Sequence, residues 1–163
     1  GLKKWRAEGR PVQSGAASPK PGKFTAAFDP ARVRSKAQLV DNLSSRREQL
    51  VDARAVNRFE GSAAEPRPGL RSGHIPGSRN LPYGALFDAE TGTMKPLDEL
   101  RAAFAGAGVD LAKPVVTTCG SGVSAVVLTL ALYRLGVRGS ALYDGSWSEW
   151  GLRDGPPIAT GPA

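Results

Sequence analysis

The chain has 163 residues, a formal net charge of +7, one cysteine and one histidine. A single cysteine excludes an intramolecular disulfide and a cysteine-rich zinc site, and a single histidine leaves too few ligands for a histidine-based metal site. No signal segment is evident, and no uninterrupted apolar run reaches the roughly 18 residues of a membrane span. We therefore expect a soluble, cytoplasmic protein with no metal, no cofactor and no membrane partner.

The positive charge does not by itself indicate a nucleic-acid-binding protein. Proteins of that class gather Lys and Arg into a stripe or patch, whereas the arginines of this chain, for example those from Arg32 to Arg79, are scattered along the sequence. A basic surface fits a small anionic substrate at least as well. We expect a small anionic ligand and no nucleic-acid partner.

The first 27 residues differ in composition from the rest of the chain. Residues 13–28 are rich in Gly, Pro, Ser and Ala, which is typical of a linker. The fragment before them is too short for a domain, yet it resembles the end of the chain, with one residue inserted. Its Trp5, Gly9, Pro11, Val12 and Gly15 match Trp150, Gly155, Pro157, Ile158 and Gly161. We interpret residues 1–27 as the tail of a duplicated upstream domain followed by an interdomain linker.

After the linker, segments with helical spacing alternate with short apolar or β-branched runs. Helices are expected at 35–43, with Ser35 as N-cap, and at 97–108, 123–136 and 146–151. Strands are expected at 49–54, 77–83, 113–119 and 140–145. This alternation predicts an α/β fold, with a parallel sheet covered by helices on both faces.

The one cysteine, Cys119, stands between the clearest expected strand and the most apolar expected helix. Ligands of open parallel sheets bind at the carboxyl ends of the strands. Gly120 and Gly122 allow a sharp turn there, and we expect the amides of residues 120–124 to point toward the sulfur, as in an anion-binding nest. A thiolate held in this way has a pKa below the usual value of about 8.5. The pattern favours a catalytic nucleophile.

The residues alone leave two other interpretations of Cys119 open. A buried core thiol is the commoner fate of a lone cysteine, although burial does not require two glycines directly after it. A phosphatase with a C-x5-R loop needs an arginine six residues after the cysteine, and that position holds Ala125. The loop has no charged side chain to neutralise a phosphoryl dianion, which disfavours a phosphatase.

The sequence CGSGVSA at 119–125 resembles the active-site loop of the rhodanese superfamily, in the CGSGVTA form typical of 3-mercaptopyruvate sulfurtransferases. Further motifs agree with that family in the right order. They are LVDAR (50–54), RFEGSAAEPRPG (58–69), SGHIPGSRNLPY (72–83) and YDGSWSEWG (143–151). The resemblance identifies residues 28–163 as a catalytic rhodanese domain. It makes residues 1–27 similar to the end of a first rhodanese domain and its linker.

The resemblance implies a sulfur relay through Cys119. The thiolate takes sulfane sulfur from a donor to form a persulfide, and then passes it to a thiol or cyanide acceptor. Ser121 is implied as a further catalytic residue, in a hydroxyl relay whose histidine and aspartate belong to the upstream domain. The residues implied to bind the donor are Arg58, Arg67, Gly120, Ser121, Gly122, Val123 and Ser124.

The same resemblance indicates the donor. Members that prefer thiosulfate, a dianion, usually carry Arg and Lys directly after the cysteine, where this chain has Gly120 and Ser121. Arg58 and Arg67 correspond to two arginines that hold the single carboxylate of 3-mercaptopyruvate, and a guanidinium suits a carboxylate well. We therefore expect 3-mercaptopyruvate as donor. A thiosulfate sulfurtransferase and a noncatalytic rhodanese interaction module are the alternatives.

The single histidine, His74, lies in the segment GHIPG. In rhodanese domains this motif mainly orders the loop that leads into the next strand. A histidine without a visible carboxylate partner is weak evidence for catalysis. We expect a structural role for His74.

Overall fold

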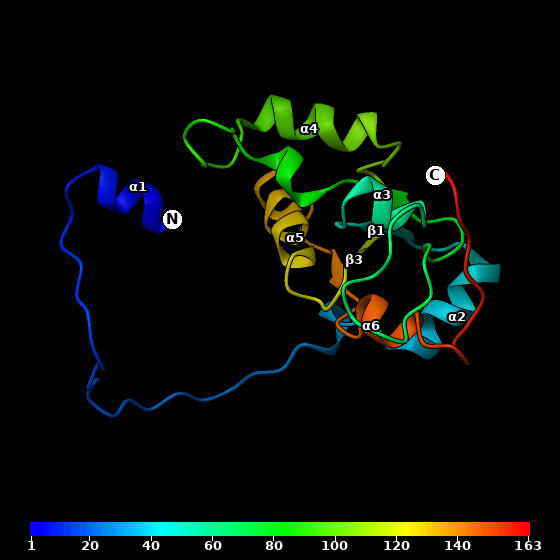
Figure 1. Ribbon diagram of the computed structural model, residues 1–163, viewed down its shortest axis with the longest axis horizontal. Coiled ribbons are helices and arrows are strands. Elements are labelled where there is room, and N and C mark those ends of the chain that lie inside the picture. The colour runs from blue at the N-terminus through cyan, green and yellow to red at the C-terminus, as the bar shows by residue number, and fades with distance from the viewer.

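The computed structural model describes residues 1–163 and has the expected α/β architecture (Figure 1). Four parallel strands form one sheet in the order β2-β1-β3-β4. The strands are β1 (Gln49–Asp52), β2 (Arg79–Asn80), β3 (Val115–Thr118) and β4 (Ala141–Leu142). The helices are α1 (Leu2–Ala7), α2 (Lys36–Ser45), α3 (Val56–Phe59), α4 (Leu97–Gly106), α5 (Ala125–Arg134) and α6 (Ser146–Trp150), and 3-10 turns lie at Pro30–Arg32 and Tyr83–Leu86.

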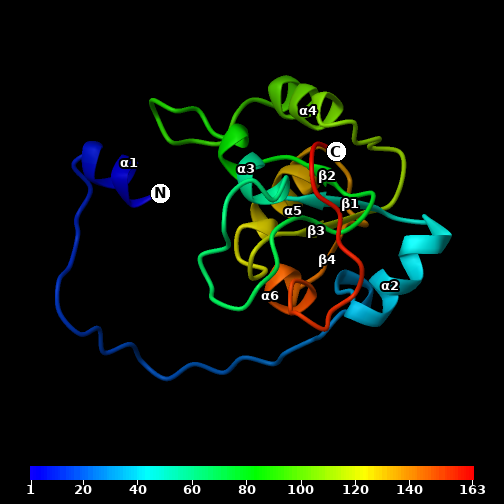
Figure 2. The ribbon, with the colours of Figure 1, turned by 45° about the vertical axis from the view of Figure 1, so that its right-hand side comes forward.

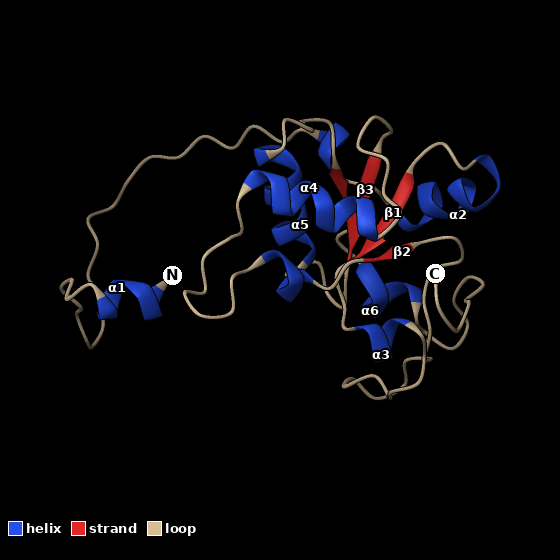
Figure 3. Ribbon diagram, turned by 90° about the horizontal axis from the view of Figure 1, so that it is seen from above, coloured by secondary structure: helices blue, strands red, loops and turns tan.

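The two central strands supply a hydrophobic core on each face of the sheet, because successive side chains of a strand point to opposite faces. Val51 and Val115 belong to one buried cluster, together with apolar residues of α4 and α5. Leu50 and Val116 belong to a second cluster, together with residues of α2 and α6. Seen from above, α4 and α5 lie on one side of the strands and α2 lies on the other (Figure 3). The predicted coverage of both faces is confirmed.

Local signals in the sequence place the helix that begins the domain. The Ser35 hydroxyl accepts a hydrogen bond from the Gln38 amide at 3.3 Å, and the Gln38 side chain accepts one from the Ser35 amide at 2.8 Å. This capping box satisfies two donors that an α-helix otherwise leaves without partners at its start. The prediction of Ser35 as N-cap is confirmed.

All eight predicted helices and strands are present, and the differences lie at their ends and in the shortest elements. The strand expected at 77–83 pairs only at Arg79 and Asn80. Beyond Asn80 the chain turns into a 3-10 turn that starts at Tyr83, directly after Pro82, which has no amide proton for a ladder. The helices α1 and α3 are missing from the prediction: α1 lies in the fragment interpreted as a domain tail, and the four residues of α3 are too few for a periodic pattern.

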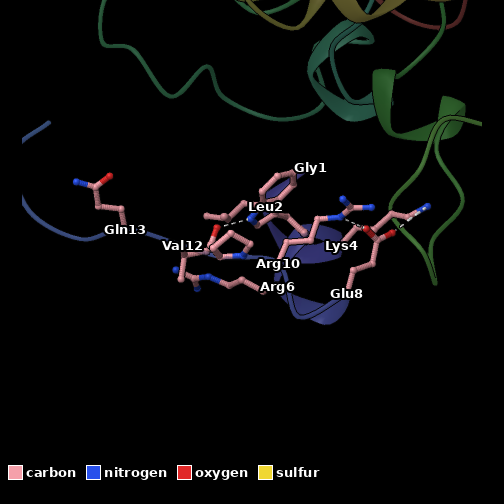
Figure 4. Close-up of a pocket in the computed structure, with 10 residues that line it drawn as sticks. Gly1, Leu2, Lys4, Arg6, Glu8, Arg10, Val12 and Gln13 are labelled. Atoms are coloured by element: carbon pink, nitrogen blue, oxygen red, sulfur yellow. Dashed lines mark hydrogen bonds and ion pairs between the residues drawn. The ribbon is translucent and has the colours of Figure 1, made fainter. Parts of the chain in front are cut away.

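The N-terminal segment lies apart from the sheet. Residues 1–32 are all exposed, and an extended stretch joins α1 to the domain (Figures 1 and 2). A cavity of about 760 Å³ beside α1 is lined wholly by residues of the segment 1–13 (Figure 4). In the same segment the Trp5 indole donates to the Pro11 carbonyl at 2.7 Å. That cavity therefore belongs to the N-terminal segment. The interpretation of residues 1–27 as a domain tail with its linker, and of residues 28–163 as one domain, stays a prediction.

None of the helices combines the length and the apolar character that crossing a membrane requires. The most apolar of them, α5, has ten residues. A membrane-spanning helix needs about 20.

The packing of α5 gives a matched pair of substitutions. Leu128 is fully buried and Leu130 is 53% exposed on the same helix. Leu128→Ala removes core contacts, and we expect it to lower the free energy of unfolding by about 2–5 kcal/mol. Leu130→Ala is the same chemical change at a surface position, where we expect an effect within about 0.5 kcal/mol. Urea unfolding followed by circular dichroism measures both, and equal losses would contradict the described packing of α5.

Candidate active site

Cys119 follows β3 directly, and its side chain is buried beside a pocket of about 380 Å³. The carboxyl end of β3 thus opens into the pocket, as expected for a parallel sheet. The residues that line the pocket are Arg58, Glu65, Pro66, Arg67, Leu70, Tyr83, Cys119, Gly120, Ser121, Val123 and Ser124. The structure brings together every sequence-predicted site residue except Gly122.

The turn after β3 stabilises the thiolate form of Cys119. Burial raises the pKa of the thiol, but the Ser124 hydroxyl and the amides of Ser121, Ala125 and Ser124 donate hydrogen bonds to the sulfur. These donors outweigh burial, so the pKa of Cys119 lies below its ordinary value. A sulfur anion surrounded by fixed donors is a nucleophile that needs no neighbouring base.

The amides of residues 120–124 are all expected to point toward the sulfur, and Gly122 departs from this expectation. Its amide donates to the Ser146 hydroxyl at 3.0 Å and not to the sulfur, so the expectation of an inward amide is wrong at this residue. Its φ is +79°, and a Cβ there would lie 2.6 Å from Asp144 Oδ1. The Gly122 backbone therefore shapes the turn from outside the pocket.

Ser146 holds the active-site loop in place through hydrogen bonds to its backbone. Its hydroxyl accepts hydrogen bonds from the amides of Cys119 at 3.2 Å and Gly122 at 3.0 Å, and donates to the Tyr143 carbonyl at 2.8 Å. Ser146 is fully buried and has φ +50°, a conformation that side-chain-bearing residues rarely adopt. The hydrogen bonds offset this strain, and they fix where the turn after Cys119 begins.

The start of α6 holds the same loop through its backbone. The Trp147 amide donates to the Cys119 carbonyl and the Ser148 amide to the Gly120 carbonyl, both at 3.0 Å. The Ser148 hydroxyl also donates to the Gly120 carbonyl, at 2.5 Å. The loop is therefore fixed against α6 before any ligand binds.

The two predicted donor-binding arginines reach the pocket from different places. Arg58, on α3, contacts the buried Glu65 carboxylate with Nη2 at 2.5 Å and Nε at 3.2 Å. Its guanidinium packs on the loop, since a Cβ on Gly120 would lie 3.1 Å from Arg58 Nη2. Arg67, in the segment after α3, donates to the Ser148 hydroxyl. Both guanidinium groups thus lie beside Gly120, with Arg67 reaching it through Ser148.

The remaining predicted residues differ in exposure. Val123 is 75% exposed at the edge of the pocket, while Ser121 is half-buried and supplies its amide to the sulfur. No hydrogen bond joins the Ser121 hydroxyl to another protein group. The catalytic and binding roles of these residues stay predictions.

His74 lies outside the pocket and is buried. Its ring stacks on Phe59, with 3.8 Å between the ring centroids, and its Nδ1 lies 2.8 Å from the Phe59 carbonyl oxygen. Its backbone pairs with Ala159 in both directions. The ring and backbone of His74 thus join α3 to the C-terminal segment, which fits the expected structural role.

Sequence reasoning missed several residues of this site, and Ser146 and Glu65 are the two that hold its other groups in place. Ser146 is distant from Cys119 along the chain and looks like an ordinary helix-starting serine, so no local pattern marks it. Glu65 lies two residues before Arg67 within the motif RFEGSAAEPRPG (58–69), and that proximity is the available signal. Its two ion pairs depend on the tertiary fold.

Comparison with known proteins places this geometry in a family. Residues 35–153 match the model of the rhodanese-like domain. The chain is 44% identical over 156 residues to 3-mercaptopyruvate sulfurtransferase of Homo sapiens, covering 96% of this chain and 52% of that protein. It is also 44% identical over 158 residues to thiosulfate sulfurtransferase of Cricetulus griseus, with coverage of 96% and 52%.

A solved structure agrees with both. The crystal structure of SseA from Escherichia coli, described as a 3-mercaptopyruvate sulfotransferase, matches with a TM-score of 0.78 and 40% identity, over 91% of this chain and 55% of that one. This chain therefore spans about half the length of the relatives that it matches.

The hydrogen bond from Ser124 to the sulfur gives a prediction about thiol reactivity. Alkylation requires the thiolate, so its rate rises as the pH passes the pKa of Cys119. Ser124→Ala removes one donor to the anion, which raises the pKa and moves this rise to higher pH, with a several-fold slower reaction at neutral pH. Iodoacetamide labelling across a pH series measures it, with Ser44→Ala on α2 as control. An unchanged profile would mean that the Ser124 hydroxyl does not stabilise the thiolate.

Proposed function

Because the chain belongs to the rhodanese family, we propose that it is a sulfurtransferase that carries sulfane sulfur on Cys119 from 3-mercaptopyruvate to a thiol or cyanide acceptor. One observation above all supports this proposal. The Cys119 sulfur accepts hydrogen bonds from one hydroxyl and three amides and lies in a pocket that two arginines also line. Such donors stabilise a persulfide anion as they stabilise a thiolate.

The reaction divides into two transfers. In the first, the Cys119 thiolate attacks the sulfur of 3-mercaptopyruvate, the carbon–sulfur bond breaks, and pyruvate leaves as its enolate, which takes a proton. In the second, an acceptor thiolate or cyanide attacks the outer sulfur, the sulfur–sulfur bond breaks, and the Cys119 thiolate returns. Covalent catalysis replaces one difficult transfer with two easier ones.

The arginines fit a donor that carries one carboxylate. Arg67 donates only to the neutral Ser148 hydroxyl, so its charge is available to the donor. A charge-assisted, planar contact with a carboxylate positions the donor sulfur over Cys119. The loop itself contributes Gly120 and Ser121 and no further cation.

Thiosulfate is the second candidate donor. The chain is as similar to a thiosulfate sulfurtransferase as to a 3-mercaptopyruvate sulfurtransferase, at 44% identity in both cases. The uncharged loop favours the carboxylate donor, because a dianion gains more from additional cations. The two candidate donors thus differ in charge, and an experiment that offers each of them separately to the chain distinguishes them.

We propose that a further rhodanese domain packs beside this pocket in a longer protein. The relatives are about twice as long as this chain. A stripe of exposed apolar residues runs from the pocket along one face of α5, comprising Val123 (75% exposed), Val126 (47%), Leu130 (53%) and Tyr133 (51%). A relay through Ser121 would also need its histidine from elsewhere, since His74 lies outside the pocket.

We also propose that the protein works in the cytoplasm. A persulfide carrier needs its thiol free between reaction cycles. The reducing conditions of the cytoplasm keep thiols free.

Loading of Cys119 tests the proposed function. After incubation with 3-mercaptopyruvate, we expect the intact mass of the chain to rise by one sulfur atom, and we expect cyanide to remove that atom as thiocyanate. Cys119→Ser removes the nucleophile and should gain nothing. Mass spectrometry before and after cyanide measures both steps.

The outcomes separate the proposals. A gain of sulfur from thiosulfate alone would overturn the donor while leaving the relay in place. No gain from either donor, with the thiol intact, would contradict sulfur transfer by this chain.

Arg67 gives a second prediction. Arg67→Gln removes the available cation from the pocket, and we expect the KM for 3-mercaptopyruvate to rise by about 10–100-fold, the usual cost of a lost charge-assisted hydrogen bond. Arg153→Gln removes a cation from an exposed position outside the pocket and should leave KM unchanged. Steady-state thiocyanate formation measures both variants, and equal effects would argue against donor binding by Arg67.

A further inference from the structure

The pocket beside Cys119 contains a buried carboxylate, Glu65, that sulfur transfer itself does not use. The Glu65 side chain is only 2% exposed, yet it lines the pocket. A carboxylate is buried at great cost unless it is paired and hydrogen-bonded. Glu65 forms an ion pair with Arg54 and another with Arg58. These two pairs determine how much charge the pocket presents to a ligand.

The two pairs of Glu65 are not equivalent. Arg54 donates to Glu65 Oε1 at 2.8 Å, but it also pairs with Asp52, with 2.7 Å between Arg54 Nη2 and Asp52 Oδ2. The side chains of Arg54 and Asp52 are both 1% exposed, so this ion pair is buried, and neither residue lines the pocket. Arg54 thus has a full countercharge of its own.

Arg58, in contrast, has Glu65 as its only carboxylate partner. The guanidinium contacts Glu65 through Nη2 and Nε, and its side chain is 27% exposed to the pocket. Asp52 neutralises Arg54, and Glu65 neutralises Arg58 at short range. Charges paired this closely act on a ligand largely as a neutral group.

Apart from the Cys119 thiolate, which is the reacting group, the charged side chains that line the pocket are Arg58, Arg67 and Glu65, and these three leave one net positive charge beside the thiolate. That charge lies at Arg67, since its one hydrogen-bond partner is the neutral Ser148. A single uncompensated cation matches a monoanion. A dianion would leave one of its charges unmatched in a partly desolvated site.

We propose that Glu65 is a specificity-determining residue: by neutralising Arg58, it leaves one net positive charge among the side chains around the Cys119 thiolate and so selects a monocarboxylate sulfur donor over a dianionic one. This inference rests on the proposed sulfur transfer. It assigns to Glu65 a role in choosing the donor and none in the chemical step.

Glu65→Gln tests the inference, because glutamine keeps the size and much of the hydrogen bonding while removing the charge. The measurement is the second-order rate constant for loading Cys119 with 3-mercaptopyruvate and with thiosulfate. We expect the ratio of the two constants to move toward thiosulfate by on the order of tenfold, since the freed Arg58 charge attracts a dianion more strongly than a monoanion. A merely structural role would slow both donors in parallel.

Two further variants keep the charge argument separate from folding. Glu65→Asp retains the charge, and its ratio should stay within about threefold of the original chain. Glu48→Gln removes the same charge from an ion pair with Arg34 at the other end of β1, outside the pocket, and should leave the ratio unchanged. A shift in Glu48→Gln as large as that in Glu65→Gln would overturn the inference.

Arg58→Gln decides the question even where Glu65→Gln does not fold. With Glu65 kept, it lowers the net charge of the pocket by one, so loading by thiosulfate should fall more than loading by 3-mercaptopyruvate. The double variant Glu65→Gln, Arg58→Gln restores one net positive charge, and its ratio should return toward the original. Equal losses for both donors in Arg58→Gln would contradict the charge account.

Failure of this inference is distinct from failure of the proposed function. If the original chain loads from neither donor, sulfur transfer is overturned. Calorimetric binding of pyruvate, a monoanion, and sulfate, a dianion, then still tests Glu65, with sulfate expected to gain on pyruvate in Glu65→Gln. An unchanged preference between these anions would overturn the role of Glu65.

Discussion

The hydrogen bonds that converge on the Cys119 sulfur are the constraint on which the rest of the site depends. A buried thiol is normally driven toward its neutral form, and only donors aimed at the sulfur reverse that tendency. Amides can be aimed in this way only if the turn after β3 keeps one shape. Ser146 and the start of α6 fix that shape from below, and Gly122 supplies the left-handed conformation that it needs.

A second feature of the site is the arrangement of charged side chains around the sulfur. Residues 120–124 have no ionised side chain, so the positive charge beside the Cys119 thiolate comes from arginines on α3 and on the segment after it. The buried Glu65 carboxylate holds Arg58 in place, and Arg67 is tied to the loop through Ser148. In the proposed function, the group that reacts and the groups that would bind the donor thus come from different parts of the fold, which meet at Gly120.

The sequence predicts those features that local patterns encode. The parallel sheet follows from alternating strands and helices, the position of Cys119 from its place after an apolar strand, and the arginines from the family resemblance. The outward Gly122 amide, the fastening by Ser146 and the pairing of Glu65 were not predictable in the same way. Each depends on two segments that are distant along the chain and meet only in the folded domain.

The most direct test of the central claim is a crystal structure of the chain after reaction with 3-mercaptopyruvate. We predict one additional sulfur atom bonded to Cys119 Sγ. This outer sulfur should point toward the loop of residues 120–125 and lie within hydrogen-bond distance of the backbone amides of that loop. An additional sulfur that points away from these amides, or a modification at any other residue, would contradict the view that this loop is built to hold a sulfur anion.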